Sequence, residues 1–237
     1  MSIVKRFCAN LTAARPPGIV KTDDKEAAMA DAMELCNDTM PIFRRENIPA
    51  KGYTYRDYYS WGEDVRCELI DGIPYMLAAP TLRHQWVAGK IYTQIDTFLD
   101  GKPCRAFIAP LDVRLFHEQD ESDKTVVQPD VLVVCDESKL SDGRSCRGAP
   151  DFVVEVVSEG SVKKDFVTKK DRYEKAGVRE YWAIDEEEVR KYELVDGWYR
   201  QTVFALDENL CVDVGVLPGC RISFKEIIAQ ALPDVSN

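Results

Sequence analysis

Short apolar runs in the middle of the chain predict the strands of a sheet. Val131–Cys135 and Phe152–Val157 are continuous, rich in β-branched residues, and of the length of buried strands rather than helices. Residues 111–116 alternate between apolar and other side chains, as a half-exposed strand does. Residues 180–185 predict one more strand. The pattern therefore favours a sheet that combines buried and half-exposed strands.

Two Asp-Gly dipeptides, Asp71-Gly72 and Asp196-Gly197, predict hairpin turns. An Asp-Gly pair readily adopts the positive φ angles that a two-residue turn needs. The flanking runs are 65–70 and 73–77 for the first turn, and 189–195 and 198–204 for the second. The chain thus carries one hairpin before the predicted strands of the core and one after them.

Two helices are predicted between the strands. Thr81 can cap the first helix, which Gly101 stops. Its apolar residues recur at helical spacing: Val87, Ile91, Ile95 and Phe98. One face of the second helix is defined by Phe166, Lys170, Tyr173 and Gly177, the last being suited to a left-handed cap. Lys169 and Ala176 flank this face, so Lys169 is predicted to point inward or along the edge of the buried surface.

The two ends of the chain divide it into an extension and a domain. Residues 1–52 are predicted to be an N-terminal extension with one helix, rich in alanine and acidic residues, at 23–35. The domain is predicted to span 53–237, including the second hairpin and a short last helix. That helix is predicted from the capping-box spacing of Ser223 and Glu226 and is expected to continue through Leu232.

Asp130 and Glu155 stand out against apolar surroundings, because Asp130 precedes the first buried run and Glu155 interrupts the second. A buried carboxylate is costly unless it is paired or bound to a metal ion. Two acids on successive core strands therefore suggest a shared cation. Two other interpretations stay open: Asp130 as an ordinary turn or cap residue, and Glu155 as the partner of Lys169 or Lys170 in an ion pair that binds no metal.

Net charge limits the classes of partner. The chain carries a net charge of −10 and has a pI near 4.9, which argues against non-specific coating of nucleic acid. Residues 163–179 nevertheless hold seven basic residues against three acidic ones. The default interpretation is a solvated helix surface, on which Lys163, Lys164 and Lys170 contact phosphate only if a nucleic acid binds there.

Cysteine usage and hydropathy indicate a cytoplasmic protein without disulfides. The eight cysteines show no Cys-x-x-Cys spacing, and a chain of this length needs no disulfide framework. Cys135, at the end of an apolar run, is interpreted as a small buried hydrophobe. No stretch is apolar over the roughly 18 residues that a membrane span requires. The basic N-terminus is not followed by the apolar core of a secretory signal.

Several segments together carry a family resemblance. They are Gln128-Pro129-Asp130, the strand Asp151-Phe-Val-Val-Glu155, the helical spacing Asp165-x-x-x-Lys169-x-x-x-Tyr173, and Ala176-Gly177-Val178-x-Glu180-Tyr181-Trp182. This set resembles the putative restriction endonuclease family of the PD-(D/E)XK phosphodiesterase superfamily. The similarity covers 53–195 and extends to the Glu68–Gly72 hairpin and to His84 at the start of the first long helix.

The resemblance implies a restriction-endonuclease-like fold of the α/β (α+β) class, in which a mixed sheet is flanked by helices and accompanied by additional hairpins. It also implies a Mg²⁺-dependent phosphodiesterase site at the edge of the sheet. Asp130 matches the Pro-Asp of the superfamily, and Glu155 matches the acid of its second motif. Val157 occupies the place of the usual lysine, and Lys169 matches a lysine displaced onto the following helix.

The implied metal ligands are Asp130, Glu155 and the main-chain carbonyl of Val156, since Mg²⁺, or Mn²⁺ in its place, prefers oxygen ligands. Lys169 is then expected to act as a base or to stabilise charge on the phosphate. Glu68 and His84 are candidates for additional catalytic residues. Each also has a plainer interpretation: Glu68 as a surface residue of the hairpin, and His84 as a residue without a role in the site. Two further residues are interpreted without a catalytic role: His117 at the surface, and Tyr173 in the core with its hydroxyl near the site.

These expectations lead to one function and two alternatives. The first is a metal-dependent endonuclease that hydrolyses phosphodiester bonds of DNA, expected as a two-fold homodimer because both strands must be cut. One alternative is a catalytically silent nuclease-fold module for binding or assembly, which the acidic net charge favours. The other is a hydrolase of small phosphodiesters or nucleotides. The glycine-rich motifs of dinucleotide-binding proteins and P-loop enzymes are absent from the sequence, as is the Gly-x-Ser-x-Gly nucleophile motif.

Overall fold

The structure is a computed structural model that describes residues 48–62, 65–157 and 168–229. The helix predicted at 23–35 and most of the predicted extension lie outside the described residues. Within these ranges the strands form one sheet of six, one of five and one of two. None of the described helices combines the length and apolar character needed to span a bilayer.

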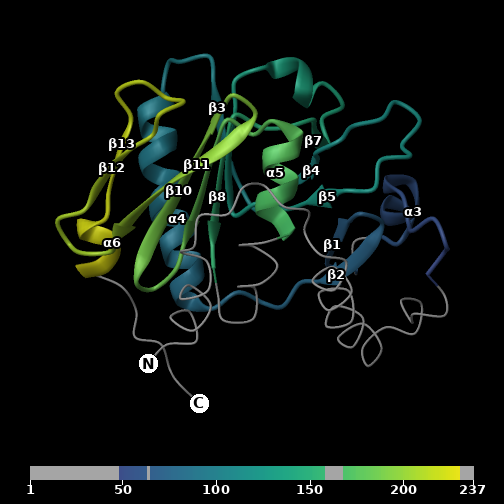
Figure 1. The fold of residues 1–237 in the computed structure, drawn as a ribbon, viewed down its shortest axis with the longest axis horizontal. Coiled ribbons are helices and arrows are strands. Elements are labelled where there is room, and N and C mark those ends of the chain that lie inside the picture. The colour runs from purple at the N-terminus through teal and green to yellow at the C-terminus, as the bar shows by residue number, and fades with distance from the viewer. Residues whose placement is uncertain (1–47, 63–64, 158–167, 230–237) are drawn as a thin grey trace.

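The large sheet lies at the centre of the fold (Figure 1). Its strands, in order across the sheet, are β11 (Trp198–Ala205), β10 (Glu188–Val195), β9 (Glu180–Ile184), β8 (Phe152–Val156), β6 (Val131–Val134) and β3 (Arg105–Ile108). Strands β8 and β9 are parallel, whereas the other neighbours in this sheet are antiparallel. The mixed sheet that the family resemblance implies is therefore present.

The five-stranded sheet contains the first hairpin. Its order is β2 (Ile73–Met76), β1 (Cys67–Ile70), β5 (Val126–Val127), β4 (Asp112–Arg114) and β7 (Ser145–Arg147). The predicted Asp-Gly turn is confirmed, with φ of 53° at Asp71 and 81° at Gly72. A Cβ atom at Gly72 would lie 2.9 Å from the Cα of Gly52, so this turn also requires glycine for close packing.

Helix α4 (Leu82–Leu99) covers one face of the large sheet. Thr81 caps it as predicted, because its hydroxyl accepts a hydrogen bond from the His84 N–H at 3.1 Å. The two-stranded sheet, β12 (Cys211–Asp213) and β13 (Arg221–Ser223), and helix α6 (Lys225–Ala229) complete this side. Ser223 ends strand β13, and α6 begins two residues later; its predicted continuation to Leu232 lies beyond the described residues.

Helix α5 (Lys170–Ala176) packs against the other face, beside the five-stranded sheet (Figure 1). It ends at Gly177, whose φ of 89° is the left-handed cap predicted from the sequence. Apolar residues of both sheets meet α5 in one core cluster, which includes Val113, Val153 and Tyr173. The second core therefore lies between the two sheets, on the side of the large sheet opposite α4.

Helix α3 (Tyr55–Ser60) covers side chains of β4 that the sequence predicts to be exposed. The guanidinium of Arg114 lies 3.9 Å from the ring centroid of Tyr55 and pairs with buried Asp123. The Tyr58 hydroxyl donates a hydrogen bond to Asp112 at 2.9 Å. The prediction of a half-exposed strand at 111–116 is therefore wrong for Arg114, because α3 shields that face from solvent.

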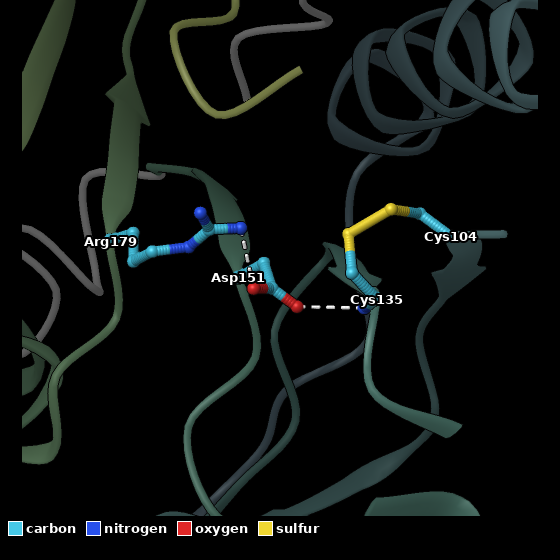
Figure 2. Close-up of a disulfide and its surroundings, with 4 residues drawn as sticks. All are labelled: Cys104, Cys135, Asp151 and Arg179. Carbon is cyan, nitrogen blue, oxygen red and sulfur yellow. Dashed lines mark hydrogen bonds and ion pairs between the residues drawn. A yellow bond between two sulfur atoms is a disulfide. The ribbon is translucent and has the colours of Figure 1, made fainter.

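A disulfide joins the edge strand β3 to β6 (Figure 2). Arg105 pairs with Val134 in the antiparallel register. Cys104, one residue before Arg105, and Cys135, one residue after Val134, therefore lie opposite each other. The prediction of a reduced, buried Cys135 is wrong for this reason: strand pairing brings together two cysteines 31 positions apart. The cysteines described as free are Cys67, Cys146, Cys211 and Cys220.

Asp151 fixes the end of the large sheet that carries the disulfide. Its carboxylate accepts hydrogen bonds from the Cys135 N–H at 2.7 Å and from Arg179 at 2.6 Å (Figure 2). Asp151 and Glu155 thus sit at opposite ends of the same stretch of strand. Although Asp151 belongs to the motif that carries the family resemblance, its contacts are structural.

Candidate active site

Strands β6 and β8 place the two predicted acids next to each other. Val131 pairs with Val154, so Asp130, the residue before β6, and Glu155 each lie one residue beyond this pair, at the same end of the two strands. The Asp130 carboxylate also accepts a hydrogen bond from the Val156 N–H at 2.7 Å. The structure therefore brings Asp130, Glu155 and the Val156 main chain together.

Glu155 projects toward the core that contains α5. Its Oε1 accepts hydrogen bonds from Lys169 Nζ at 2.8 Å and from the Tyr173 hydroxyl at 2.6 Å. The side chains of Glu155 and Lys169 are only 5% and 4% exposed. The inward direction that the helical pattern predicts for Lys169 is thus confirmed. The predicted helix residue Phe166, together with Asp165, Lys163 and Lys164, lies outside the described residues.

Glu68 reaches the same lysine from the five-stranded sheet. Its Oε1 lies 2.7 Å from Lys169 Nζ and accepts a hydrogen bond from the Gln128 N–H at 2.9 Å. The Glu68 side chain is completely buried. The interpretation of Glu68 as a surface residue is therefore wrong, because all four residues of β1 are buried within the fold. One lysine is held between two carboxylates from different sheets.

His84 joins the site from the first turn of α4. Its Nε2 lies 3.1 Å from the Oδ2 atom of Asp130. The exposed fractions of these two side chains are 16% for His84 and 14% for Asp130, larger than those of Glu155 and Lys169. Solvent or a substrate can therefore reach the cluster from the side of Asp130 and His84.

The cluster has an excess of negative charge. Among the described residues, Asp130, Glu155 and Glu68 contribute three carboxylates when ionised, against the ammonium of Lys169. Burial, followed by the carboxylates of Glu155 and Glu68, raises the pKa of Tyr173 well above its ordinary value, so its hydroxyl stays protonated and donates to Glu155. A divalent cation would balance the remaining carboxylate charge.

The donor atoms suit a hard cation. No group of three or more His, Cys, Asp or Glu side chains in the described ranges is arranged as a metal centre. Mg²⁺ is nevertheless commonly held by one or two carboxylates, with water and substrate phosphate as its other ligands. Asp130, Glu155 and the carbonyl of Val156 provide oxygen atoms only, so the residues present fit such an ion.

A polar network extends the site along β4. The Asp112 carboxylate accepts hydrogen bonds from Tyr58 and from the Gln128 side chain, both at 2.9 Å. Burial raises the pKa of Asp112 above its ordinary value, although these two hydrogen bonds oppose the shift, and the charge of Glu68 raises it further. Sequence reasoning missed this residue, since its alternation with Leu111 and Val113 is typical of a solvent-facing position. The adjacency of Gln128 to the Pro-Asp motif is the only signal in the sequence.

Comparison with known proteins places this fold and site in a family. A family model described as Uma2, putative restriction endonuclease, matches residues 54–225. Among solved structures, the chain is similar to a putative nuclease belonging to DUF820 from Anabaena variabilis ATCC 29413. The two are 19% identical with a TM-score of 0.60, over 76% of this chain and 99% of the other, which shows a shared fold. No curated protein matches the chain significantly.

The resemblance to restriction endonucleases and the mixed α+β fold predicted from the sequence are thereby confirmed. The matched range includes Glu68, His84, Asp130, Glu155 and Lys169. Because the family model matches most of the chain, the protein belongs to the Uma2 family of putative restriction endonucleases.

Proposed function

We propose that this protein is a metal-dependent endonuclease that hydrolyses phosphodiester bonds of DNA. The observation that carries the proposal is the convergence of Asp130, Glu155 and Lys169, which are far apart in the sequence, at the ends of two paired strands. Family membership supports nuclease activity, and the solved structure with a similar fold is itself described as a putative nuclease.

The proposed metal ion is Mg²⁺, with Mn²⁺ as an alternative, held by Asp130, Glu155 and the Val156 carbonyl. When bound, the ion supplies Lewis-acid chemistry: it lowers the pKa of water and offsets negative charge on the phosphate. The hydrogen bond from the Val156 N–H to Asp130 and the one from Tyr173 to Glu155 hold both carboxylates in place before any ion arrives.

Lys169 is the proposed source of positive charge next to the reacting phosphate. Its two carboxylate neighbours, Glu68 and Glu155, fix the position of the amine. His84 lies at the more exposed side of Asp130, where its Nε2 can hold that carboxylate in place. Glu68 acts through Lys169, so it is a positioning residue in this scheme.

Cleavage of DNA tests the proposal. Supercoiled and single-stranded DNA are incubated with the wild-type protein and with Asp130→Ala, in the presence of Mg²⁺, Mn²⁺ or a chelator. We expect metal-dependent cleavage that falls by at least about 100-fold in the variant. Asp213→Asn removes an exposed carboxylate on β12 and serves as the matched control. The proposal fails if the wild type cuts neither substrate, or if Asp130→Ala cuts as fast as Asp213→Asn.

A catalytically silent binding module is the second candidate. The engagement of the Lys169 amine by two buried carboxylates favours it, because the same geometry would serve as a structural ion pair. Titration with Mn²⁺ separates the two functions. Binding that is lost in Asp130→Ala supports the nuclease, whereas the absence of binding to the wild type supports the silent module.

The proposal includes a two-fold homodimer, in which each protomer cuts one strand. Sedimentation of the full chain measures the mass in solution, and a monomer at all concentrations that support cleavage would contradict this arrangement. The dimer is independent of the chemistry at Asp130, so its failure would leave the proposed active site intact.

A further inference from the structure

The basic segment that the sequence highlights does not form a continuous positive surface in the described residues. Lys169 is buried in the candidate active site, and Arg172 is buried against Asp71 and Asp171. Lys175 pairs with Asp171 at 2.9 Å. The interpretation of this segment as a solvated basic face is thus wrong for Arg172, whereas Lys169 is buried as the helical pattern predicts. A surface that attracts anions has to be sought elsewhere.

A basic pocket of about 560 Å³ lies beyond β4, beside the loops that flank β7. Its walls come from the segment after β4, from the 3-10 helix η3 (Glu137–Leu140) and from the segment that enters β7. The basic side chains that line it are Arg114, Lys139, Arg144 and Arg147, together with His117. We call this the basic pocket.

Three cations of the basic pocket have no carboxylate partner among the described residues. Lys139 Nζ donates to the Ala149 carbonyl at 2.7 Å, and Arg147 donates to the Ser138 carbonyl at 3.1 Å. Arg144 is exposed and lies over the Tyr59 ring, 4.9 Å from its centroid. Carbonyl groups and rings hold these side chains in place without cancelling their charge. The pocket therefore presents positive charge that is already positioned.

The acids around the basic pocket are already engaged. Both carboxylate oxygens of Asp123 accept hydrogen bonds from the Arg114 guanidinium, so this buried pair contributes no net charge. Glu121 lies 3.9 Å from Arg56. Asp142 accepts hydrogen bonds from the main-chain N–H groups of Arg144 and Ser145 and from the Ser145 hydroxyl. Among the described lining residues, Asp142 and Glu121 are thus the carboxylates beside the three cations Lys139, Arg144 and Arg147, so the pocket keeps a positive charge in a protein with a net charge of −10.

Within the part of the chain that the structure describes, two buried nitrogen atoms in the wall of the basic pocket have no hydrogen-bond partner: Arg147 Nε and His117 Nδ1. Buried polar atoms are nearly always hydrogen-bonded to protein, water or a ligand. His117 is half-buried at the surface, and its Nδ1 atom is the part that is shielded from solvent. The pocket wall therefore has hydrogen-bonding capacity that the described protein groups do not use.

We infer that the basic pocket is a second binding site, separate from the candidate active site, for the phosphate group of an anionic ligand. Arg144 and Arg147 are suited to this role because a guanidinium donates two parallel hydrogen bonds to phosphate oxygens. Lys139 adds a third positive charge. The volume falls in the range of sites that hold a nucleotide-sized ligand.

The two sites lie at different points along β4. Asp112, at its start, contacts Gln128 beside the candidate active site, whereas Arg114 and His117 follow it toward the basic pocket. Five residues of extended chain from Asp112 to His117 span at most about 17 Å. The basic pocket can therefore hold a phosphate of a nucleic acid whose cleaved bond lies at Asp130, or a free phosphate compound that binds independently of cleavage.

Equilibrium dialysis with radiolabelled inorganic phosphate tests the site on the full chain. We expect saturable binding to the wild type that weakens by about tenfold in Arg144→Ala and in Arg147→Ala. Arg144 is exposed, so its replacement does not threaten folding even if Arg147→Ala does. Arg200→Ala is the matched control, because it removes the same charge from an exposed position on β11.

Two results would overturn the inference: binding to Arg144→Ala that equals wild type, or an equal loss in Arg200→Ala, which would reflect net charge alone. Asp130→Ala should bind phosphate normally, so the basic pocket and the proposed nuclease site can fail separately. A fluorescent single-stranded oligonucleotide identifies the source of the phosphate. If its binding also depends on Arg144, the ligand is a nucleic-acid backbone; if only inorganic phosphate depends on Arg144, it is a free phosphate compound.

Discussion

Two buried glutamate–lysine clusters lie on opposite faces of the large sheet, and different groups surround the carboxylates in each. In the first, Lys169 sits between Glu155 and Glu68. In the second, Lys191 Nζ lies 3.3 Å from Glu180, on the face covered by β12 and β13. The residue types are the same, so the difference between the clusters lies in what else surrounds each acid.

Two neutral hydrogen-bond donors contact the Glu180 carboxylate, one at each oxygen. One carboxylate oxygen accepts from the Trp182 indole N–H at 2.7 Å, and the other accepts from the Val216 N–H at 2.9 Å. The turn between β12 and β13 rests directly on this carboxylate, since a Cβ atom at Gly215 would lie 3.0 Å from it. Burial still raises the pKa of Glu180 above its ordinary value, although Lys191 and the Val216 N–H oppose the shift.

The cluster around Glu155 contains more carboxylates than the one around Glu180, and one of them is partly exposed to solvent. Asp130 stands beside it, partly exposed and in contact with His84. A buried charge alone is therefore a poor marker of a functional site, since the Glu180 cluster also has one, and Lys191 there lies 3.1 Å from a second carboxylate, Glu193. Among the described residues, the Glu155 cluster differs in its third carboxylate, Asp130, and in the contact of Asp130 with His84.

Removal of each lysine should have the largest effect and should separate the two clusters. Lys169→Met removes the ammonium that two buried carboxylates share and leaves Glu155 with the Tyr173 hydroxyl and Glu68 with the Gln128 N–H, so we expect the free energy of unfolding to fall by about 3–5 kcal/mol. Lys191→Met leaves Glu180 with its indole and main-chain donors, so we expect a loss of about 1–3 kcal/mol. Urea denaturation at neutral pH measures both. An equal or larger loss in Lys191→Met would contradict the prediction that the carboxylates around Lys169 depend more on their lysine than Glu180 does on Lys191.

Removal of one hydroxyl should have a smaller effect. Tyr173→Phe deletes a hydrogen bond to the Glu155 carboxylate, and we expect a loss of about 2 kcal/mol in the free energy of unfolding. Tyr199→Phe is the matched control, because its hydroxyl donates to the neutral carbonyl of Val178; the expected loss is about 1 kcal/mol. If both variants lose the same amount, the charge of Glu155 does not strengthen the bond. Urea denaturation again provides the measurement.

The smallest expected effect depends on pH and concerns Asp112. Its pKa is raised in the folded protein, so its contribution to stability is present below the ordinary pKa of aspartate and is lost as pH rises through the raised value. Asp112→Asn has no such titration. The stability of this variant relative to the wild type should therefore increase with pH across that window and then level off. Unfolding curves from pH 4 to pH 7 measure the difference, and a decrease with pH would contradict the assignment.

The parts of the fold that sequence predicts well are those set by neighbours in the chain. The Asp-Gly turns, the Thr81 cap and the Gly177 cap each depend on a few adjacent residues, and each is confirmed. Strands β5 and β7 escape prediction because two or three residues cannot display a period. The order of the five-stranded sheet is also set by contacts between distant segments, which no local pattern records.

The candidate site shows the same division: some of its residues can be identified from the local sequence, and others only from the folded structure. Asp130, Glu155 and Lys169 could be identified because each is polar at a position where apolar residues are expected. The burial of Glu68 could not, since β1 is covered on both faces by elements remote in sequence. The basic pocket was missed for a similar reason: Lys139, Arg144 and Arg147 are unremarkable in a polar segment until folding brings them beside His117.

The disulfide between β3 and β6 has a consequence for the unfolded chain. It closes a loop of 31 positions that contains Asp112, Gln128 and Asp130. A closed loop of this length lowers the entropy of the denatured ensemble by an amount equivalent to about 4 kcal/mol at room temperature. A protease that nicks the chain between these cysteines would also leave both fragments covalently joined, so the cut halves could reassemble without having to find each other by diffusion.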